Sequence, residues 1–219
     1  MIRKVLSGAG ALAVVLGGVL VAQSGVAGAT RTPVTLSGSI TCTAIGAVKF
    51  SPALVNGGTA PDTIKVLAKL ASCSGSGASS GGVTLTGGTL KAASSSTTAN
   101  SCGAILGGSS LPQLTGTVKW KGSGGSITES SVTITNATTV LNDNGNSGQG
   151  EVDVSLPTSV TAGSYSGEGA AFSGLTSNAT GLSLDSKCGK AAGLRGVAFG
   201  KPGGTVSGSV TISAPGGGS

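Results

Sequence analysis

The chain has 219 residues, a formal net charge of +6 and only 9% charged residues, and it contains 41 glycines and no histidine. The absence of histidine excludes Ser-His and Cys-His nucleophilic sites and removes the usual zinc ligand. An apolar content of 38% and segments with matched apolar faces favour a folded protein over a disordered one.

The beginning of the chain has the three parts of a secretory signal peptide. Met1–Lys4 carries two positive charges, Gly8–Ala22 is an uncharged and mostly apolar run, and A-G-A at 27–29 is a small-residue cleavage site. A retained membrane anchor is the alternative, but glycines and Gln23 interrupt the ~20 apolar residues that a spanning helix needs. We therefore expect cleavage after Ala29, a secreted protein that is extracellular or cell-wall associated, and no membrane span in the mature chain.

The mature chain, Thr30–Ser219, would have 190 residues, enough for one domain with its own core. We place that domain at 30–213 and expect a disordered tail at 214–219. Without Arg3 and Lys4, 11 of the 13 basic residues remain against 7 acidic residues, so the mature net charge would be +4. Because the basic residues are scattered along the sequence and include only two arginines, we do not expect a nucleic-acid partner.

All four cysteines lie in the exported part of the chain, and an even count there indicates two disulfides. Three pairings are possible. We favour Cys42–Cys73 with Cys102–Cys188, because the first pair closes a short loop between neighbouring strands. The chain has no C-x-x-C pair, so a metal site is disfavoured, and no cofactor is expected.

Alternating apolar and polar residues predict about ten strands, separated by Gly, Pro, Asn and Ser turns. No long segment in the mature chain has the 3.6-residue period of a helix. The predicted fold is therefore all-β, as one antiparallel sandwich (Ig-like) or barrel. The clearest predicted strands are Val34–Cys42, Gly46–Phe50, Thr63–Leu70, Gly81–Leu90, Thr115–Lys121, Ser126–Thr135, Gly150–Leu156, Thr176–Leu184, Leu194–Phe199 and Thr205–Ile212.

The few aromatic residues are expected to belong to the core. Trp120 lies on the apolar side of an alternating strand, which is more typical of a core residue than of a ligand platform. Three of the five aromatic residues, Tyr165, Phe172 and Phe199, fall within Val160–Phe199. Together with Cys188, they indicate that this stretch has a structural role in the fold and not a chemical one.

Two patterns resemble chemical sites, and for both we favour a structural interpretation. Glu151 and Asp153, two apart on a strand, have the carboxylate spacing of a glycosidase pair, but outward-facing acids on an edge strand explain them as well. Asn142–Asp153 places oxygen ligands where a calcium loop has them, yet Ser147 stands where that loop needs glycine. We therefore predict no catalytic residues and no metal ligands.

The order of several short motifs resembles a family of small secreted actinobacterial proteins with four cysteines and no assigned activity. The resemblance extends over most of Thr30–Ile212 and implies an exported, disulfide-bonded, β-rich domain. It supplies no site residues. The motifs are Cys42 with Val48–Pro52, Ile64–Val66 with Cys73, Val118–Lys121, Gly163–Gly167, and Cys188 with Gly193-Leu194.

The leading hypothesis from the sequence is a secreted, non-enzymatic binding or structural module at or near the bacterial cell envelope, with an envelope glycan or protein as partner. A polysaccharide-acting enzyme that uses Glu151 and Asp153 is one alternative. A secreted inhibitor or antimicrobial protein is another.

Overall fold

The computed structural model describes residues 32–107, 110–142, 151–200 and 208–213. Their strands belong to one compact unit, Arg31–Ser219. The predicted signal peptide, the predicted tail at 214–219 and most of the possible calcium loop lie outside the described residues, so these remain predictions.

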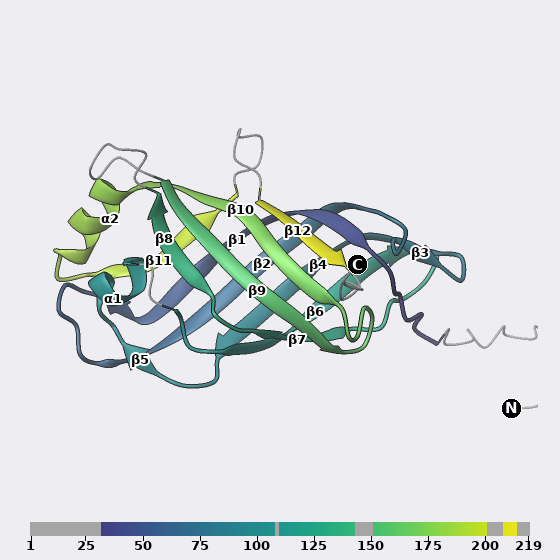
Figure 1. Ribbon diagram of the computed structural model, residues 1–219, viewed down its shortest axis with the longest axis horizontal. Coiled ribbons are helices and arrows are strands. Elements are labelled where there is room, and N and C mark those ends of the chain that lie inside the picture. Colours follow the sequence, from purple (N-terminus) through teal and green to yellow (C-terminus); the bar gives the residue numbers. More distant parts are fainter. Residues whose placement is uncertain (1–31, 108–109, 143–150, 201–207, 214–219) are drawn as a thin grey trace, which may run out of the picture. The chain divides into compact units, whose positions relative to one another are not determined.

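The described part of the chain contains twelve strands and two short helices (Figure 1). The all-β prediction is confirmed. The elements are β1 (Ile40–Leu54), β2 (Pro61–Ser74), β3 (Ser79–Ser80), β4 (Val83–Ser94), β5 (Thr98–Ala99), α1 (Cys102–Leu106), β6 (Leu114–Ser123), β7 (Ser130–Ile134), β8 (Thr138–Asn142), β9 (Glu151–Ala162), β10 (Gly169–Thr180), α2 (Gly181–Cys188), β11 (Leu194–Phe199) and β12 (Gly208–Ser213).

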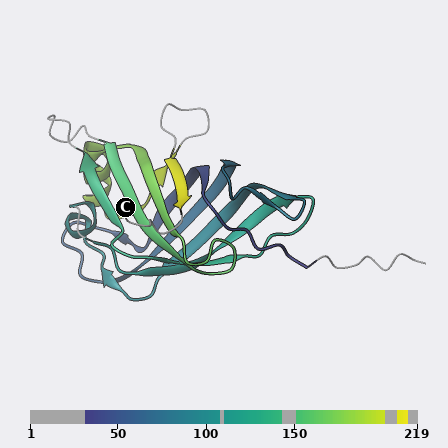
Figure 2. The same ribbon diagram turned by 45° about the vertical axis from the view of Figure 1, so that its right-hand side comes forward.

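Eight of these strands close into an antiparallel barrel. The hydrogen-bonded path runs β1-β12-β10-β9-β7-β6-β4-β2 and returns to β1, because β2 pairs with β1 over most of its length. Figure 2 shows the strands wrapping around a common interior. Closure leaves none of these eight strands as a free sheet edge, so their backbone groups are paired on both sides.

Along one of its edges, each of the long strands β1 and β9 pairs with two different strands, one after the other. The first five residues of β1 pair with β12, and the same edge further along, Gly46–Leu54, pairs with β11. In β9, Glu151–Ser155 pairs with β8 and Thr158–Ala162 pairs with β7. The extra strand β11 therefore continues the wall beside β1 where β12 ends, and β8 continues it beside β9 where β7 ends.

The structure corrects several predicted boundaries. Gly46–Phe50 is the middle of β1 and not a separate strand, because β1 stays paired with β2 from Thr43 to Ser51. Thr176–Leu184 is not one strand, because β10 ends at Thr180 and α2 follows. The predicted strand Leu194–Phe199 coincides with β11.

The predicted loops are also shorter than expected. The Ser/Gly-rich composition of Ser72–Gly82 and the polar composition of Ser94–Asn100 predict loops, but the first includes the end of β2 and the two residues of β3, and the second includes β5. In Ser126–Thr135, only Ser130–Ile134 is a continuous strand, while Ile127 forms an isolated bridge with Val34. The partners of β5 and of Ile127 lie far away in the sequence, whereas β3 is a two-residue hairpin partner of β4, and local alternation reveals none of these short elements.

Both favoured disulfides are present. Cys42–Cys73 joins the adjacent strands β1 and β2, as expected for a short local loop. Cys102–Cys188 joins the first residue of α1 to the last residue of α2 across 86 residues of sequence. The second bridge holds the two helices together at one end of the barrel (Figure 1).

Candidate functional site

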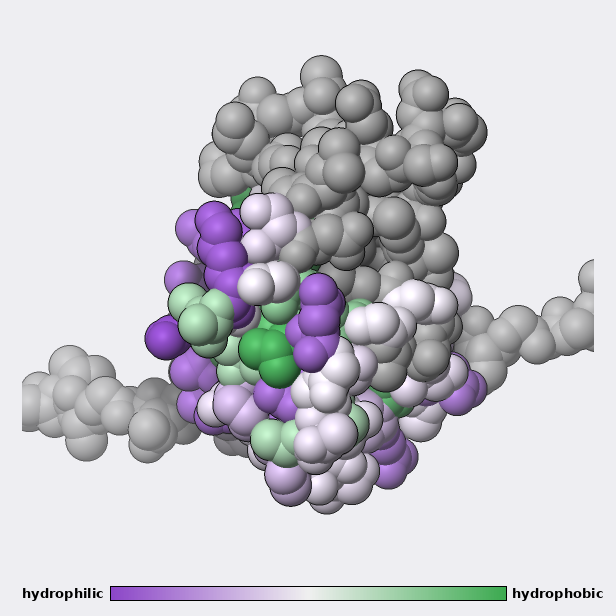
Figure 3. Space-filling view, turned by 90° about the vertical axis from the view of Figure 1, so that its left-hand side faces the viewer, coloured by the Kyte–Doolittle hydropathy of each residue, from purple (hydrophilic) through white to green (hydrophobic). Residues whose placement is uncertain are grey.

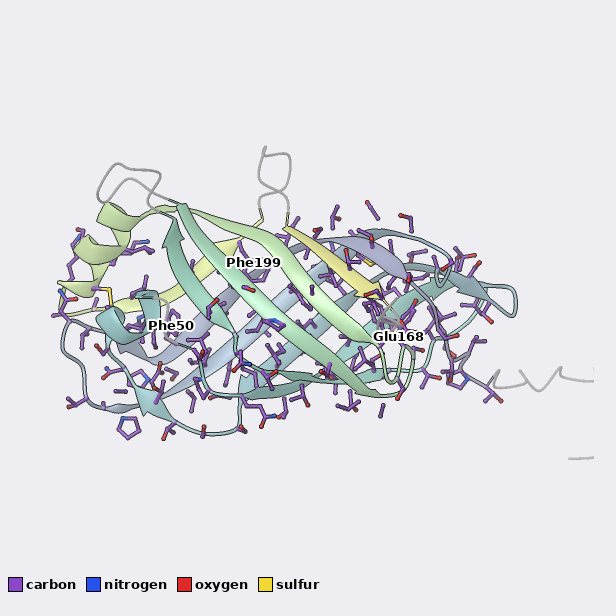
Figure 4. All side chains as sticks on the ribbon, viewed as in Figure 1. Phe50, Glu168 and Phe199 are labelled. Atoms are coloured by element: carbon purple, nitrogen blue, oxygen red, sulfur yellow. A yellow bond between two sulfur atoms is a disulfide. The ribbon has the colours of Figure 1, made fainter. Side chains whose placement is uncertain are left out.

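Described side chains from every strand of the eight-stranded barrel form one buried apolar core inside it. All five aromatic residues are buried, as predicted: Phe50, Trp120, Tyr165, Phe172 and Phe199. Phe50 lies toward the end that carries the helices, and Phe199 comes from β11 (Figure 4). An enclosed apolar cavity among the core residues has a volume of only about 10 Å³, about the size of one water probe. This cavity is too small to bind an organic ligand.

A buried polar network closes the end of the barrel away from the helices. The indole of Trp120 donates a hydrogen bond of 2.7 Å to Ser130 Oγ, which donates to the backbone carbonyl of Ser164. The ring of Trp120 also meets that of Tyr165 edge-on, with 5.3 Å between the ring centroids. Each polar group of the network has a buried partner, which suits a structural role.

Glu168, labelled in Figure 4, attaches the segment that precedes β1 to this end, and Tyr165 attaches the turn that follows β2. The Tyr165 hydroxyl donates to the carbonyl of Gly77 at 2.9 Å, and Glu168 Oε1 accepts the N–H of Gly38 at 2.8 Å. Burial, with the charge of Glu168 as a smaller cause, raises the pKa of Tyr165 well above its usual range. Glu168 Oε2 is buried and accepts no hydrogen bond from the described residues.

A second buried carboxylate, Asp62, lies in the first part of β2. Its Oδ1 accepts the N–H of Ser51 at 2.6 Å, and its Oδ2 is buried without a hydrogen-bond partner among the described residues. Burial raises the pKa of Asp62, while the backbone N–H groups of Ser51 and Thr63 partly oppose that shift. Asp62 lies in β2, whereas Glu168 lies in the turn between β9 and β10, so the two carboxylates belong to separate parts of the fold.

The predicted carboxylate pair falls in β9, where Asp153 pairs with Val140 on one side and with Thr176 on the other. The interpretation of Glu151 and Asp153 as acids on an edge strand is therefore wrong, since β9 has a neighbour on both sides. Their side chains lie outside those that the structure describes, so the enzyme alternative remains a prediction. Within the described residues no group of three His, Cys, Asp or Glu side chains could hold a metal ion.

The feature that the sequence did not reveal is a lysine face on the outside of β1, β2, β4 and β6. Strand registers place these lysines on neighbouring strands with their side chains exposed, although they are scattered over 73 positions of sequence. They lie on the outer side because their neighbours in each strand point into the core. The lysine face comprises Lys49, Lys65, Lys69, Lys91, Lys119 and Lys121.

The charge on this surface is almost unopposed. Glu129 lies beside the face and contacts Lys119, with 3.8 Å between Nζ and Oε2, and both side chains are exposed. The other carboxylates with described side chains, Asp62 and Glu168, are buried. On the opposite half of the barrel, the described outward side chains of β7, β9, β10 and β12 are Ser, Thr, Ala and Pro and carry no charge.

A shallow groove of about 320 Å³ crosses the lysine face. Three lysines and two threonines line it, together with Trp120, whose side chain belongs to the core. The outward residues are Thr89 and Lys91 from β4, and Thr117, Lys119 and Lys121 from β6. Ammonium and hydroxyl groups that share one groove can donate hydrogen bonds to an anionic ligand.

The helix-bearing end of the barrel offers a weaker candidate surface. Figure 3 faces this end and shows small apolar spots separated by polar residues over the described part of the surface. No helix among the described residues is long and apolar enough to cross a membrane.

No family model, no curated protein and no solved structure matches this chain. The resemblance to secreted actinobacterial proteins therefore remains a prediction.

Proposed function

We propose that this chain is a secreted, non-enzymatic binding module that acts at or near the bacterial cell envelope. The observation that carries the proposal is the contrast between the two sides of the barrel wall. Among the described side chains, the apolar cavity inside the barrel has space for about one water, whereas the outside carries the lysine face. Binding is therefore assigned to the outer surface.

The two disulfides support the proposed location, because such bridges persist in oxidising compartments outside the cytoplasm. The signal-peptide pattern at residues 1–29 supports it from the sequence. Both are consistent with an extracellular or cell-wall-associated protein.

Co-sedimentation tests this proposal. The purified protein, with both disulfides formed, is mixed with washed bacterial envelope fragments and centrifuged. We expect it to appear in the pellet, and to be released from the fragments by raised salt if charge dominates the contact. Recovery of all the protein in the supernatant at low salt would contradict an envelope-binding role.

A further inference from the structure

We infer that the lysine face binds a linear phosphodiester polymer of the cell envelope, by its repeated charges. This inference rests on the proposed function, because it names the ligand of the binding module. Five of the lysines form a continuous diagonal row, which we call the lysine row: Lys49, Lys65, Lys91, Lys119 and Lys121.

The registers determine the spacing of the row. Lys49 and Lys65 are direct partners on β1 and β2, so their Cα atoms lie about 5 Å apart. Each step from Lys65 to Lys91 and from Lys91 to Lys119 crosses to the next strand and moves two residues along it, which gives about 8 Å. Lys119 and Lys121 are about 7 Å apart on β6. A polymer with one negative charge per repeat of similar length could contact successive lysines.

The chemistry of the groove favours phosphate oxygens. Lysine ammonium groups and threonine hydroxyl groups commonly contact phosphates in protein–nucleic acid complexes, and Thr89 and Thr117 lie between the lysines here. The six charges of the face are all lysine and none is arginine. Lysine acts as a point charge on a flexible stem, so it tolerates many orientations of a flexible polymer.

The same face lacks the groups that read bases or stack on sugar rings. All five aromatic residues of the chain are buried, so none offers a stacking surface. The outward residues of β1, β2, β4 and β6 include no Arg, Asn or Gln, the side chains that most often read base edges. The composition of the face therefore favours a polymer that is recognised only by the charges of its backbone.

The test uses poly(glycerol phosphate) as the probe, titrated into the disulfide-bonded protein by calorimetry. We expect binding whose logarithmic affinity falls linearly with the logarithm of the salt concentration, measured from roughly 50 to 200 mM. The double variant Lys65→Gln/Lys91→Gln removes two charges from the lysine row and keeps the Lys119–Glu129 contact. It should bind about tenfold more weakly, with a salt slope smaller in magnitude by about 1 to 2.

The matched control is Lys187→Gln/Lys190→Gln. It lowers the net charge by the same amount at two exposed lysines at the end of α2 and just after it, away from the face. Its affinity should stay within about twofold of wild type. Equal weakening in both double variants would overturn the inference, because it would show a response to net charge alone.

Three further probes separate phosphodiester envelope polymers from other anions. Polygalacturonate presents carboxylates, duplex DNA presents phosphates on a nucleic acid, and phosphatidylglycerol vesicles present phosphates on a membrane. We expect weaker binding to each than to poly(glycerol phosphate). Equal or tighter binding to any of them, or no binding to the main probe, would overturn the assignment.

The inference and the proposed function can fail separately. If the Lys65→Gln/Lys91→Gln variant co-sediments with envelope fragments as well as wild type does, the module role stands and the lysine face is not its site. If the protein binds poly(glycerol phosphate) through the face but stays out of the envelope pellet, the inference stands and the envelope role fails.

Discussion

Tyr165 shows how one residue can close the end of a barrel. Its φ of 61° lies in the left-handed region, which is uncommon for a residue with a large side chain. The turn holds this conformation because the Tyr165 ring packs on Trp120, its N–H donates to the carbonyl of Leu36, and its hydroxyl donates to that of Gly77. These contacts join three segments that are far apart in the sequence.

The ionisation of Tyr165 should be coupled to unfolding. Because its pKa is raised in the folded state, the folded protein holds the phenolic proton more tightly than the unfolded chain does. The stability from this group is fully present below pH ~10, the usual tyrosine pKa, and is lost as the pH rises above it. Tyr165 is the only tyrosine, so phenolate absorbance in an alkaline titration should rise together with loss of far-UV circular dichroism.

The Tyr165→Phe variant is the control for this titration. It should lose the absorbance step and the part of the alkaline destabilisation that comes from the hydroxyl. A wild-type phenolate signal that titrates near pH 10 while the fold stays intact would contradict the prediction.

The backbone at Gly46 packs so closely against its neighbours that it leaves no room for a side chain. An added Cβ would collide with the backbone carbonyl of Leu67 and would lie 2.6 Å from the Phe199 ring. We expect Gly46→Ala to lower the free energy of unfolding by about 1 to 3 kcal/mol. At Gly169 an added Cβ meets no heavy atom within 4 Å, so Gly169→Ala should change the free energy of unfolding by less than about 0.5 kcal/mol. Urea unfolding of both variants measures this difference, and equal stabilities would contradict it.

At the scale of elements, the two disulfides stabilise different parts of the fold. Cys42–Cys73 joins β1 and β2, which are already hydrogen-bonded to each other along their length, whereas Cys102–Cys188 joins two short helices that belong to no common sheet. The second bridge also encloses a longer loop, 86 residues against 31. A longer loop loses more entropy in the unfolded state when it is closed.

The loop-entropy model predicts the order of the two effects. Replacing Cys42 and Cys73 by alanine should cost about 4 kcal/mol, and replacing Cys102 and Cys188 about 5 kcal/mol. Urea unfolding of the two double variants, with the disulfide-bonded wild type as reference, measures both losses. A larger loss for the Cys42–Cys73 variant would show that local strand pairing, and not loop length, sets the contribution.

At the scale of the whole molecule, the interior and exterior of the barrel have separate roles. Alternation along the strands sends most of the described Val, Leu and Ile side chains and four of the five aromatic side chains inward, and sends lysine and most threonine side chains outward. The interior is consequently a packed core, and the charge is concentrated over one half of the wall.

A packed interior predicts that the native protein takes up no apolar small molecule. A fluorescent hydrophobic probe such as ANS should show no saturable binding at neutral pH, because the enclosed cavity holds only about 10 Å³. The same probe should bind when the protein is partly unfolded by acid, which serves as the positive control. Stoichiometric binding to the native state would contradict a filled barrel.

The sequence by itself determined the fold class, most strands, the buried aromatic residues and the favoured cysteine pairing. Strict alternation, as in β2 and β6, depends only on which side of a strand each residue occupies, and that is a local property. The short sequence distance between Cys42 and Cys73, which lie close to the ends of two predicted strands, is likewise a local clue. The short elements β3, β5, α1 and α2 could not be predicted because none has a long apolar period: β3 is a two-residue hairpin partner of β4, β5 pairs with the distant start of β2, and a disulfide joins α1 to α2.

Only the tertiary structure decided that the barrel closes and that the lysines gather. The lysine row depends on the registers β1–β2, β2–β4 and β4–β6, and a shift of one residue in any of them would displace it. Lys49 and Lys65 are 16 positions apart in the sequence, yet they are direct partners across two strands. The positions of the lysines in the sequence do not reveal that these two residues are partners, because the strand register is set by the packing of the whole core.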